Sequence, residues 1–353
     1  MRLMNQQLFE NSSTSLLVTA PYSSSGLLQS LPSPPEGRTG WPWTEETPPL
    51  PPTMPNGQPW PKISIVTPSY NQGQFIEETI RCVLLQNYPN LEYIILDGGS
   101  TDATKEILER YSPWLSYVVS KPDKGQSDAI ATGFELASGE LLAWLCSDDL
   151  YLKGALQWAA NQFIANPQID LICGATNLDQ GAGWFPWIET RYRYSTPTYP
   201  KLIACGQCIQ QPGCFWTKRA YHKTPGVDRS LKFCMDYDLL LKLCRVGKAK
   251  YWEREIAWMR IHKDSKTSTL HDVHNKERSL IIDKALQTSS FPNFHLCTLS
   301  YLATLKYLSK TPQFKFPQRL WKMLHLAAGY FYHTLNGDIF KWHPVRGFCK
   351  SDN

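Results

Sequence analysis

Acidic side chains follow a short apolar run in the first half of this 353-residue chain, where they could hold a metal ion. Asp148 and Asp149 come directly after residues 141–146, which are typical of a buried strand. Two adjacent carboxylates in such a place repel each other unless a cation or hydrogen bonds relieve them. Mg²⁺ and Mn²⁺ prefer a few carboxylates together with phosphate oxygens. The pair therefore indicates a site for Mg²⁺ or Mn²⁺, with a solvated loop as the alternative.

Two further apolar runs end in polar side chains. The run 63–66 continues into Thr67-Pro68-Ser69-Tyr70-Asn71, whose hydroxyls and amide suit hydrogen bonds to a base or a ribose. Asp97 closes the run 91–96 and could accept hydrogen bonds from a sugar hydroxyl or a base N–H, with helix capping as the alternative. The chain contains neither a Gly-x-Gly-x-x-Gly fingerprint nor a P-loop. The first turn therefore suits a nucleoside better than a closely wrapped pyrophosphate.

Strands and helices are expected to alternate between residues 62 and 150. Apolar runs predict strands at 63–66, 91–96, 115–120 and 141–146, and helical periodicity predicts helices at 75–85, 103–111 and 128–137. This alternation predicts an α/β fold with a mainly parallel sheet flanked by helices. Ligands of such sheets bind beyond the carboxyl ends of the strands, so the polar segments should meet there.

The second half of the chain offers another carboxylate and a basic cluster. Asp236 and Asp238 lie at the start of a predicted helix, where a carboxylate could remove a proton or simply complement the helix dipole. Arg260, His262 and Lys266 follow a predicted strand at 256–258 and could neutralise phosphate charge. The sequence thus contains a candidate base and candidate phosphate contacts outside the first half.

Four motifs resemble those of glycosyltransferase family 2 in both order and spacing. They are Ile-Val-Thr-Pro-Ser-Tyr-Asn-Gln-Gly (65–73), Asp-Gly-Gly-Ser-Thr-Asp (97–102), Asp-Lys-Gly-Gln-Ser-Asp-Ala (123–129) and Ser-Asp-Asp (147–149). The resemblance covers residues 62–268 and is to a non-processive, bacterial-type member. It implies the GT-A fold, in which a Rossmann-like sheet holds a nucleotide-sugar, and transfer with inversion at the anomeric carbon.

The resemblance also implies roles for individual residues. The donor would be bound by Thr67, Ser69, Asn71, Asp97, Gly98, Ser100, Asp128, Asp148, Arg260, His262 and Lys266. Asp148 and Asp149 would hold the metal, Asp236 would be the catalytic base, and the acceptor would meet Gln211, Asp238 and Trp187. The chain departs from the family at Cys146, where the acidic site often has its first carboxylate, and at Ala131, where many members have Asn. The first departure could weaken metal affinity.

The function implied is transfer of a sugar from a nucleotide-sugar to an acceptor hydroxyl. A UDP- or dTDP-sugar is the favoured donor, and a glycan or lipid-linked acceptor in cell-surface polysaccharide or glycolipid synthesis is expected. One alternative is a catalytically silent member that only binds nucleotide-sugar, but such a protein should have lost a carboxylate at the metal or base position. A nucleotidyltransferase would need a glycine-rich basic first loop, which this chain lacks.

Composition divides the chain into three regions. Residues 1–61 hold 12 of the 26 prolines and form a Pro-rich arm, which is either a flexible leader or packs back through Trp41 and Trp43. Residues 62–270 are expected to form the GT-A domain, with a nucleotide-sugar half at 62–150 and an acceptor half at 151–270. Residues 271–353 are expected to form a helical, basic extension.

The net charge of +5 is concentrated near the C-terminus. Residues 301–350 have a net charge of +7, which leaves −2 for the rest of the chain, so no nucleic-acid surface is expected. Basic and aromatic side chains interleave in this segment, which suits either contact with an anionic membrane surface or a helical cap with a solvated basic face. Neither a signal peptide nor an 18-residue apolar run is apparent, so a cytoplasmic location is expected, with the inner face of the membrane as a variant.

Overall fold

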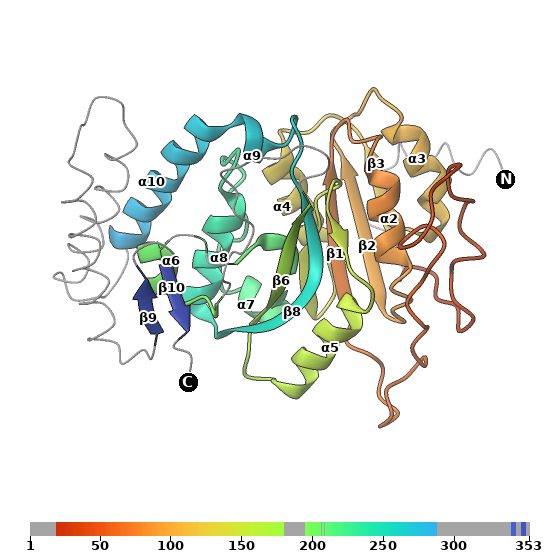
Figure 1. Ribbon diagram of the computed structural model, residues 1–353, viewed down its shortest axis with the longest axis horizontal. Helices are drawn as coiled ribbons and strands as arrows, with labels where there is room; N and C mark the ends of the chain where they lie inside the picture. The colour runs from red at the N-terminus through yellow and green to blue at the C-terminus, as the bar shows by residue number, and fades with distance from the viewer. Residues whose placement is uncertain are drawn as a thin grey trace.

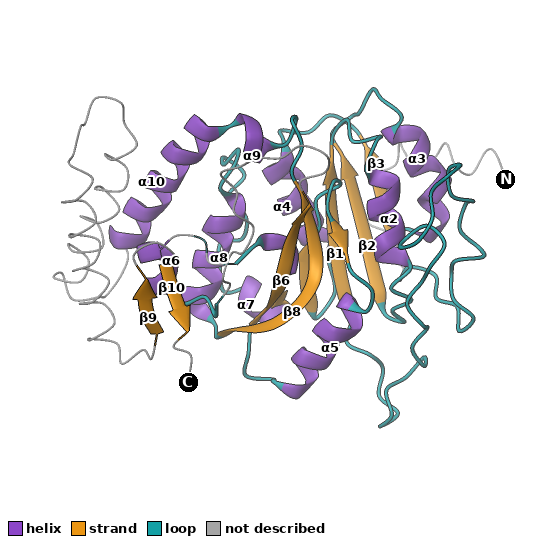
Figure 2. Ribbon diagram, viewed as in Figure 1, coloured by secondary structure: helices purple, strands orange, loops and turns teal. Residues whose placement is uncertain are grey.

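A central sheet with helices on both faces organises the chain (Figures 1 and 2). The computed structural model describes residues 19–179, 195–205, 207, 209–287, 340–343 and 347–350. Within them, the sheet has eight strands in the order β3-β2-β1-β4-β7-β6-β8-β5. Trp187, which was predicted to contact the acceptor, lies outside the described residues.

One half of the sheet is parallel. Its strands are β1 (Ile63–Ser69), β2 (Leu91–Asp97), β3 (Tyr117–Ser120) and β4 (Leu141–Trp144). Every residue of β1, β2 and β4 is buried, as expected for parallel strands covered on both faces. The register places Ser69 opposite Asp97 and Asp97 opposite Ser120. The carboxyl ends of three strands therefore meet at one edge of the sheet.

The other half of the sheet is mixed. It contains β5 (Leu150–Tyr151), β6 (Leu171–Asp179), β7 (Cys214–Thr217) and β8 (Ala249–Arg260). β7 is antiparallel to both β4 and β6, β8 runs parallel to β6, and β5 is antiparallel to β8. The sheet is thus mostly parallel, and its antiparallel pairs involve β5, β7 and their neighbours. The strand–helix alternation predicted for residues 62–150 did not indicate these antiparallel pairs.

The helices form two layers, one on each face of the sheet. On one face, the arm joins α2 (Ile76–Leu84), α3 (Thr104–Tyr111) and α5 (Ala155–Ala165) in a common core. The opposite face holds α4 (Gln126–Leu136), α6 (Tyr199–Cys205), α8 (Met235–Val246) and α10 (His271–Gln287). Short helical turns complete the fold, namely η1 (Ser112–Trp114), η2 (Gln211–Gly213), α7 (Lys218–Tyr221) and α9 (Lys266–Thr269).

Several predicted boundaries shift because loops make their own hydrogen bonds. The strand predicted at 141–146 ends at Trp144, since the backbone N–H of Asp149 donates to the Cys146 carbonyl in a turn at 3.0 Å. β1 runs past its predicted end to Ser69 because Pro68 still pairs with Leu96. The third strand begins at Tyr117 and not at the predicted residue 115, because Leu115 caps η1 by donating its backbone N–H to the Ser112 carbonyl.

The C-terminal region is only partly as predicted. α10 is helical, and its Ile281 and Ile282 pack into the core around α8. The prediction of a helical extension is wrong for β9 (Phe340–His343) and β10 (Gly347–Lys350), which pair antiparallel. The expected membrane-contacting segment lies largely outside the described residues. Among the helices that the structure describes, none combines the length and the apolar character needed to span a bilayer.

The Pro-rich arm from residue 19 onward is packed against α2, which rules out a flexible leader for this part (Figure 1). Arg81 of α2 is fully buried and donates to three arm carbonyls: Pro32 at 2.7 Å, Pro42 at 3.0 Å and Trp43 at 2.9 Å. The Arg81 guanidinium also lies 5.5 Å from the centre of the Trp43 ring. One side chain thus satisfies several buried carbonyls at once, which fixes the arm to the helix.

We predict that Arg81→Met will detach the arm and lower the free energy of unfolding by about 3 kcal/mol, because buried carbonyls lose their donors. Chemical denaturation measures the loss, and chymotrypsin cleavage after Trp43 reports the exposed arm. Arg110→Met is the matched control, since Arg110 is half-exposed and its ion pair with Glu77 contributes under about 1 kcal/mol. Equal stability of the two variants would contradict this role of Arg81.

Candidate active site

A cleft of about 810 Å³ lies at the edge where β1, β2 and β4 end. This volume is within the range typical of small-molecule sites. Its wall includes Ser69 and Gly98 after the first two strands, the acidic loop 146–149 after β4, and Asp236 at the start of α8. The predicted meeting of polar strand ends is thus confirmed, and the second half of the chain adds the facing wall.

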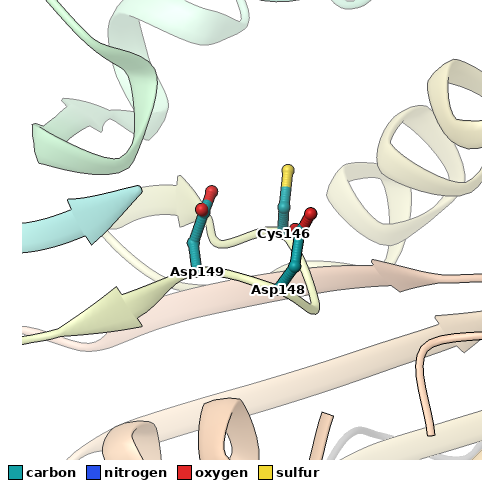
Figure 3. Close-up of side chains that lie close together, drawn as sticks. All are labelled: Cys146, Asp148 and Asp149. Carbon is teal, nitrogen blue, oxygen red and sulfur yellow. The ribbon is translucent and has the colours of Figure 1, made fainter. Parts of the chain in front are cut away.

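The acidic loop is held in place by α2. The buried hydroxyl of Thr79 donates to the carbonyls of Ser147 at 3.0 Å and Asp149 at 2.9 Å. The loop places the Sγ of Cys146 and carboxylate oxygens of Asp148 and Asp149 within 4.8 Å of one another. All three side chains point to the same side of the loop (Figure 3). The arrangement resembles one face of a coordination shell, and these ligands fit a divalent cation.

Basic groups at the end of β8 relieve only part of the negative charge. The backbone N–H of Arg260 donates to Asp149 at 3.1 Å, and His262 Nε2 lies 3.1 Å from Asp148 Oδ2. The Arg260 guanidinium is shared between the Asp148 carbonyl and the carboxylate of Glu78. Burial and the neighbouring charge of Asp148 raise the pKa of Asp149 well above its usual range. A cation at this position would remove that electrostatic strain.

Asp236 faces the same cleft from the first turn of α8. One of its carboxylate oxygens accepts a hydrogen bond from Gln207 Nε2 at 2.8 Å, and the other accepts one from the backbone N–H of Tyr237 at 2.7 Å. Burial raises the pKa of Asp236, although both hydrogen bonds oppose that rise. A carboxylate that is held in one orientation and made more basic is suited to removing a proton from a hydroxyl.

The predicted site residues fall into two groups. Those that line the cleft are Ser69, Gly98, Asp148, Asp149, Gln211, Asp236, Arg260 and Lys266. Those that do not line it are Thr67, Asn71, Asp97, Ser100, Asp128, His262 and Asp238. The sequence therefore located the cleft correctly, while several of the residues named for it lie behind its wall.

Some of the second group shape the wall. Asp97 accepts hydrogen bonds from the backbone N–H of Ser100 at 2.9 Å and from the Ser120 hydroxyl at 2.6 Å. Asn71 accepts one from the backbone N–H of Thr101 at 2.9 Å, and its own N–H donates to Ser100 Oγ at 2.7 Å. These bonds tie the loops after β1 and β2 together, so the two loops present Ser69 and Gly98 as one surface.

Other members of the second group have partners elsewhere. Thr67 is fully buried, and its hydroxyl lies 3.2 Å from the hydroxyl of Tyr93 inside the core. Asp128 pairs with Arg229, which also bonds Glu135. Asp238 pairs at 2.5 Å with Lys242, one turn along α8. These contacts are structural, so the placement of the three side chains does not favour the ligand contacts predicted for them.

Several polar residues of the site were not singled out from the sequence, and four of them stand out. Asp123, Gln126 and Asp264 line the cleft, and Gln207 bonds the carboxylate of Asp236. Asp123 and Gln126 belong to the 123–129 motif, so their position could have been inferred from it. Nothing in the local pattern around Gln207 indicates its contact, because 29 residues separate it from Asp236.

The sequence of this chain is similar to known glycosyltransferases. Residues 64–224 match the family described as glycosyl transferase family 2. An uncharacterized glycosyltransferase of Rickettsia typhi is 28% identical over 218 residues, which cover 59% of this chain and 67% of that protein. Chondroitin synthase of Pasteurella multocida is 26% identical over 239 residues, which cover 67% of this chain and 24% of the synthase. The chain thus spans about a quarter of that second relative.

Solved structures show the same fold. Staphylococcus aureus TarS 1–349 in complex with UDP-GlcNAc aligns with a TM-score of 0.55 and 17% identity, over 76% of this chain and 81% of that one. Mannosyltransferase PcManGT from Pyrobaculum calidifontis, in complex with GDP-Man and Mn²⁺, aligns with a TM-score of 0.51 and 16% identity, over 78% and 81% of the two chains. This likeness confirms the predicted α/β fold, with a mixed, mostly parallel sheet flanked by helices.

We predict that the acidic loop binds Mn²⁺ and that the affinity falls as the pH is lowered, because protons compete with the ion for Asp149, whose pKa is raised. Calorimetric titration of the metal-free chain with Mn²⁺ at several pH values measures both effects. Asp149→Asn should weaken binding by about tenfold or more, whereas Asp272→Asn, on the exposed side of α10, should not change it. Identical Mn²⁺ binding by both variants would place the ion elsewhere.

Proposed function

Because the chain belongs to glycosyltransferase family 2, we propose that it transfers a sugar from a nucleotide-sugar to an acceptor hydroxyl with inversion at the anomeric carbon. One observation supports this most strongly: a half-buried carboxylate with a raised pKa, Asp236, lines the same cleft as the acidic pair Asp148 and Asp149. An inverting displacement needs one base for the acceptor and stabilisation of the leaving diphosphate. The cleft offers residues for both.

Asp236 is the proposed base. Its deprotonated carboxylate would take the proton of the acceptor hydroxyl as the hydroxyl oxygen attacks the anomeric carbon. The hydrogen bonds from Gln207 and the Tyr237 N–H hold both carboxylate oxygens, so the base keeps one orientation during the attack. Because burial raises the pKa of Asp236, it accepts a proton more readily than an exposed aspartate would.

The proposed contacts of the diphosphate are on the other side of the cleft. Asp148 and Asp149 would hold Mg²⁺ or Mn²⁺, which when bound neutralises charge on the departing diphosphate. Lys266 lines the cleft, donates to the Lys232 carbonyl at 2.7 Å, and could add a charged contact to a phosphate oxygen. Burial lowers the pKa of Lys266, and an incoming phosphate would oppose that shift by favouring the charged form.

The donor is proposed to be a UDP- or dTDP-sugar, with its nucleoside between the loops after β1 and β2. Ser69 is 6% exposed, and its hydroxyl has no hydrogen-bond partner within the part of the chain that the structure describes. Gln72 Oε1, also at the cleft, is equally unpartnered there. Buried polar atoms without partners are costly, so both atoms are suited to a base or a ribose. The complex of TarS with UDP-GlcNAc supports a uridine nucleotide.

The acceptor is proposed to be a glycan or lipid-linked sugar of a cell-surface polysaccharide or glycolipid, to which one sugar is added per encounter. The similarity to a chondroitin synthase supports a glycan acceptor. Gln211 lies at the cleft, anchored by its Nε2–H to the Trp144 carbonyl at 2.7 Å, and is the proposed acceptor contact. Contact of the basic C-terminal segment with a cytoplasmic membrane face remains part of this proposal.

We predict that Asp236→Asn will reduce transfer by at least about a hundredfold, because the amide cannot accept the proton. The donor affinity should stay within a few fold, since the base faces the acceptor. Donor turnover with a panel of UDP-, dTDP- and GDP-sugars, followed by calorimetric binding, measures the two effects. Asp238→Asn is the matched control on the same helix and should keep turnover, because its partner is Lys242.

If the Asp236→Asn variant turned over the donor at the wild-type rate, Asp236 would not be the catalytic base. A wild-type chain that binds donor without any hydrolysis or transfer would instead indicate the catalytically silent member of the family.

We predict that turnover rises with pH through the raised pKa of Asp236, because only the deprotonated carboxylate acts as the base. Gln207→Ala removes a hydrogen bond that lowers this pKa, so the rising limb should move up by about one pH unit. The pH profile of kcat for both proteins checks this. Gln162→Ala, on α5, should leave the profile in place, and so would Gln207→Ala if Gln207 did not orient the base.

A further inference from the structure

Cys146 occupies a ligand position in the cation cluster of the cleft. Its Sγ lies within 4.8 Å of the carboxylate oxygens of Asp148 and Asp149, and it points to the same side of the loop (Figure 3). The side chain is half-buried and lines the cleft, so an ion bound by the two carboxylates would meet the sulfur. Gln126 at the start of α4 donates to this Sγ at 3.3 Å, which holds the sulfur in place.

The three donors differ in chemical character. Carboxylate oxygens are hard ligands that suit Mg²⁺ and Mn²⁺, whereas a thiolate is a soft ligand that suits Zn²⁺ and neighbouring transition metals. A site with one sulfur and two carboxylates therefore binds transition-metal ions more tightly than an all-oxygen site does. Mg²⁺ gains little from a sulfur ligand, because it demands oxygen donors in a near-octahedral arrangement.

We infer that Cys146 is the third protein ligand of the cation in this cleft, and that its sulfur makes the site select transition-metal ions such as Zn²⁺ or Co²⁺ over Mg²⁺. This inference rests on the proposed function only in sharing its cation site. On binding, the S–H bond of Cys146 breaks, its proton passes to solvent, and a sulfur–metal bond forms without any change of oxidation state. Cys146, Asp148 and Asp149 all line the cleft, so diphosphate oxygens or water would complete the coordination of the ion.

Co²⁺ tests the sulfur ligand directly. Titration of the metal-free full-length chain with Co²⁺ alone should produce a sulfur-to-cobalt charge-transfer band in the near ultraviolet, which saturates as the site fills. Cys146→Ser should lose this band and bind Zn²⁺ about tenfold more weakly or worse, while its affinity for Mg²⁺ changes by less than about threefold. Cys146→Asp should bind Mg²⁺ more tightly than the native chain, because it completes an oxygen site.

Cys244→Ser is the matched control for the other thiols, since Cys244 is a half-buried residue of α8 that does not line the cleft. It should keep the cobalt band. Retention of the band in Cys146→Ser, or Co²⁺ binding without any band in the native chain, would overturn the inference.

The outcomes separate this inference from the proposed function. If Co²⁺ binds without a sulfur band and Asp149→Asn abolishes that binding, the acidic pair still holds the cation and only the role of Cys146 fails. If neither native chain nor variants bind a divalent ion, the inference and the metal part of the proposed function both fail. Donor turnover that depends on Asp236 would survive either result, because it is measured separately.

Discussion

The forked hydrogen bond from Thr79 is the contact on which the cleft depends. Its hydroxyl sits on α2 and reaches two carbonyls of the acidic loop, those of Ser147 and Asp149. Without this bond, two buried carbonyls would lack a donor and the loop could relax away from its close packing of like charges. Two positions further along α2, Arg81 holds the Pro-rich arm. One short helix therefore connects the arm to the cation site.

The arrangement of charge explains why the loop needs such support. Asp148 and Asp149 are adjacent, and Asp149 is only 4% exposed. Arg260 and His262 contact the pair, and the Arg260 guanidinium is shared with Glu78. A loop that keeps two carboxylates close together is poised for a cation, since rigid packing around it prevents the carboxylates from moving apart.

The sequence predicted the parts of this structure that follow from local pattern. Apolar runs located the four strands of the parallel half, and their polar ends correctly indicated where Ser69, Asp148 and Asp149 would meet. It could not distinguish a polar side chain that faces the cleft from one that faces the core. Thr67 lies only two positions from Ser69 in the same strand, yet its hydroxyl pairs with Tyr93 behind the wall.

Contacts between distant segments account for the other differences. The partner of Asp128 is Arg229, and the partner of Asp236 is Gln207, and neither follows from spacing along the chain. The packing of the arm is a similar case. Its proline content predicts an extended backbone, but it does not predict that the buried Arg81 donates hydrogen bonds to the arm carbonyls. The sequence pattern thus predicts the strands and helices and the edge of the sheet where the site lies. The partners that shift the pKa of each carboxylate come from distant segments and can be seen only in the folded structure.

The arm has a consequence for the order in which the chain can fold. It is synthesised before the sheet, so its hydrogen-bond partners come later: Leu91 for Ala20, Arg81 for Trp43, and Tyr151 for Trp41, a separation of 110 residues. These pairings have a high contact order, so the arm cannot dock until the first half of the sheet exists. The arm from residue 19 onward is therefore a late piece to assemble, and its tryptophans stay accessible to chaperones until the sheet has formed.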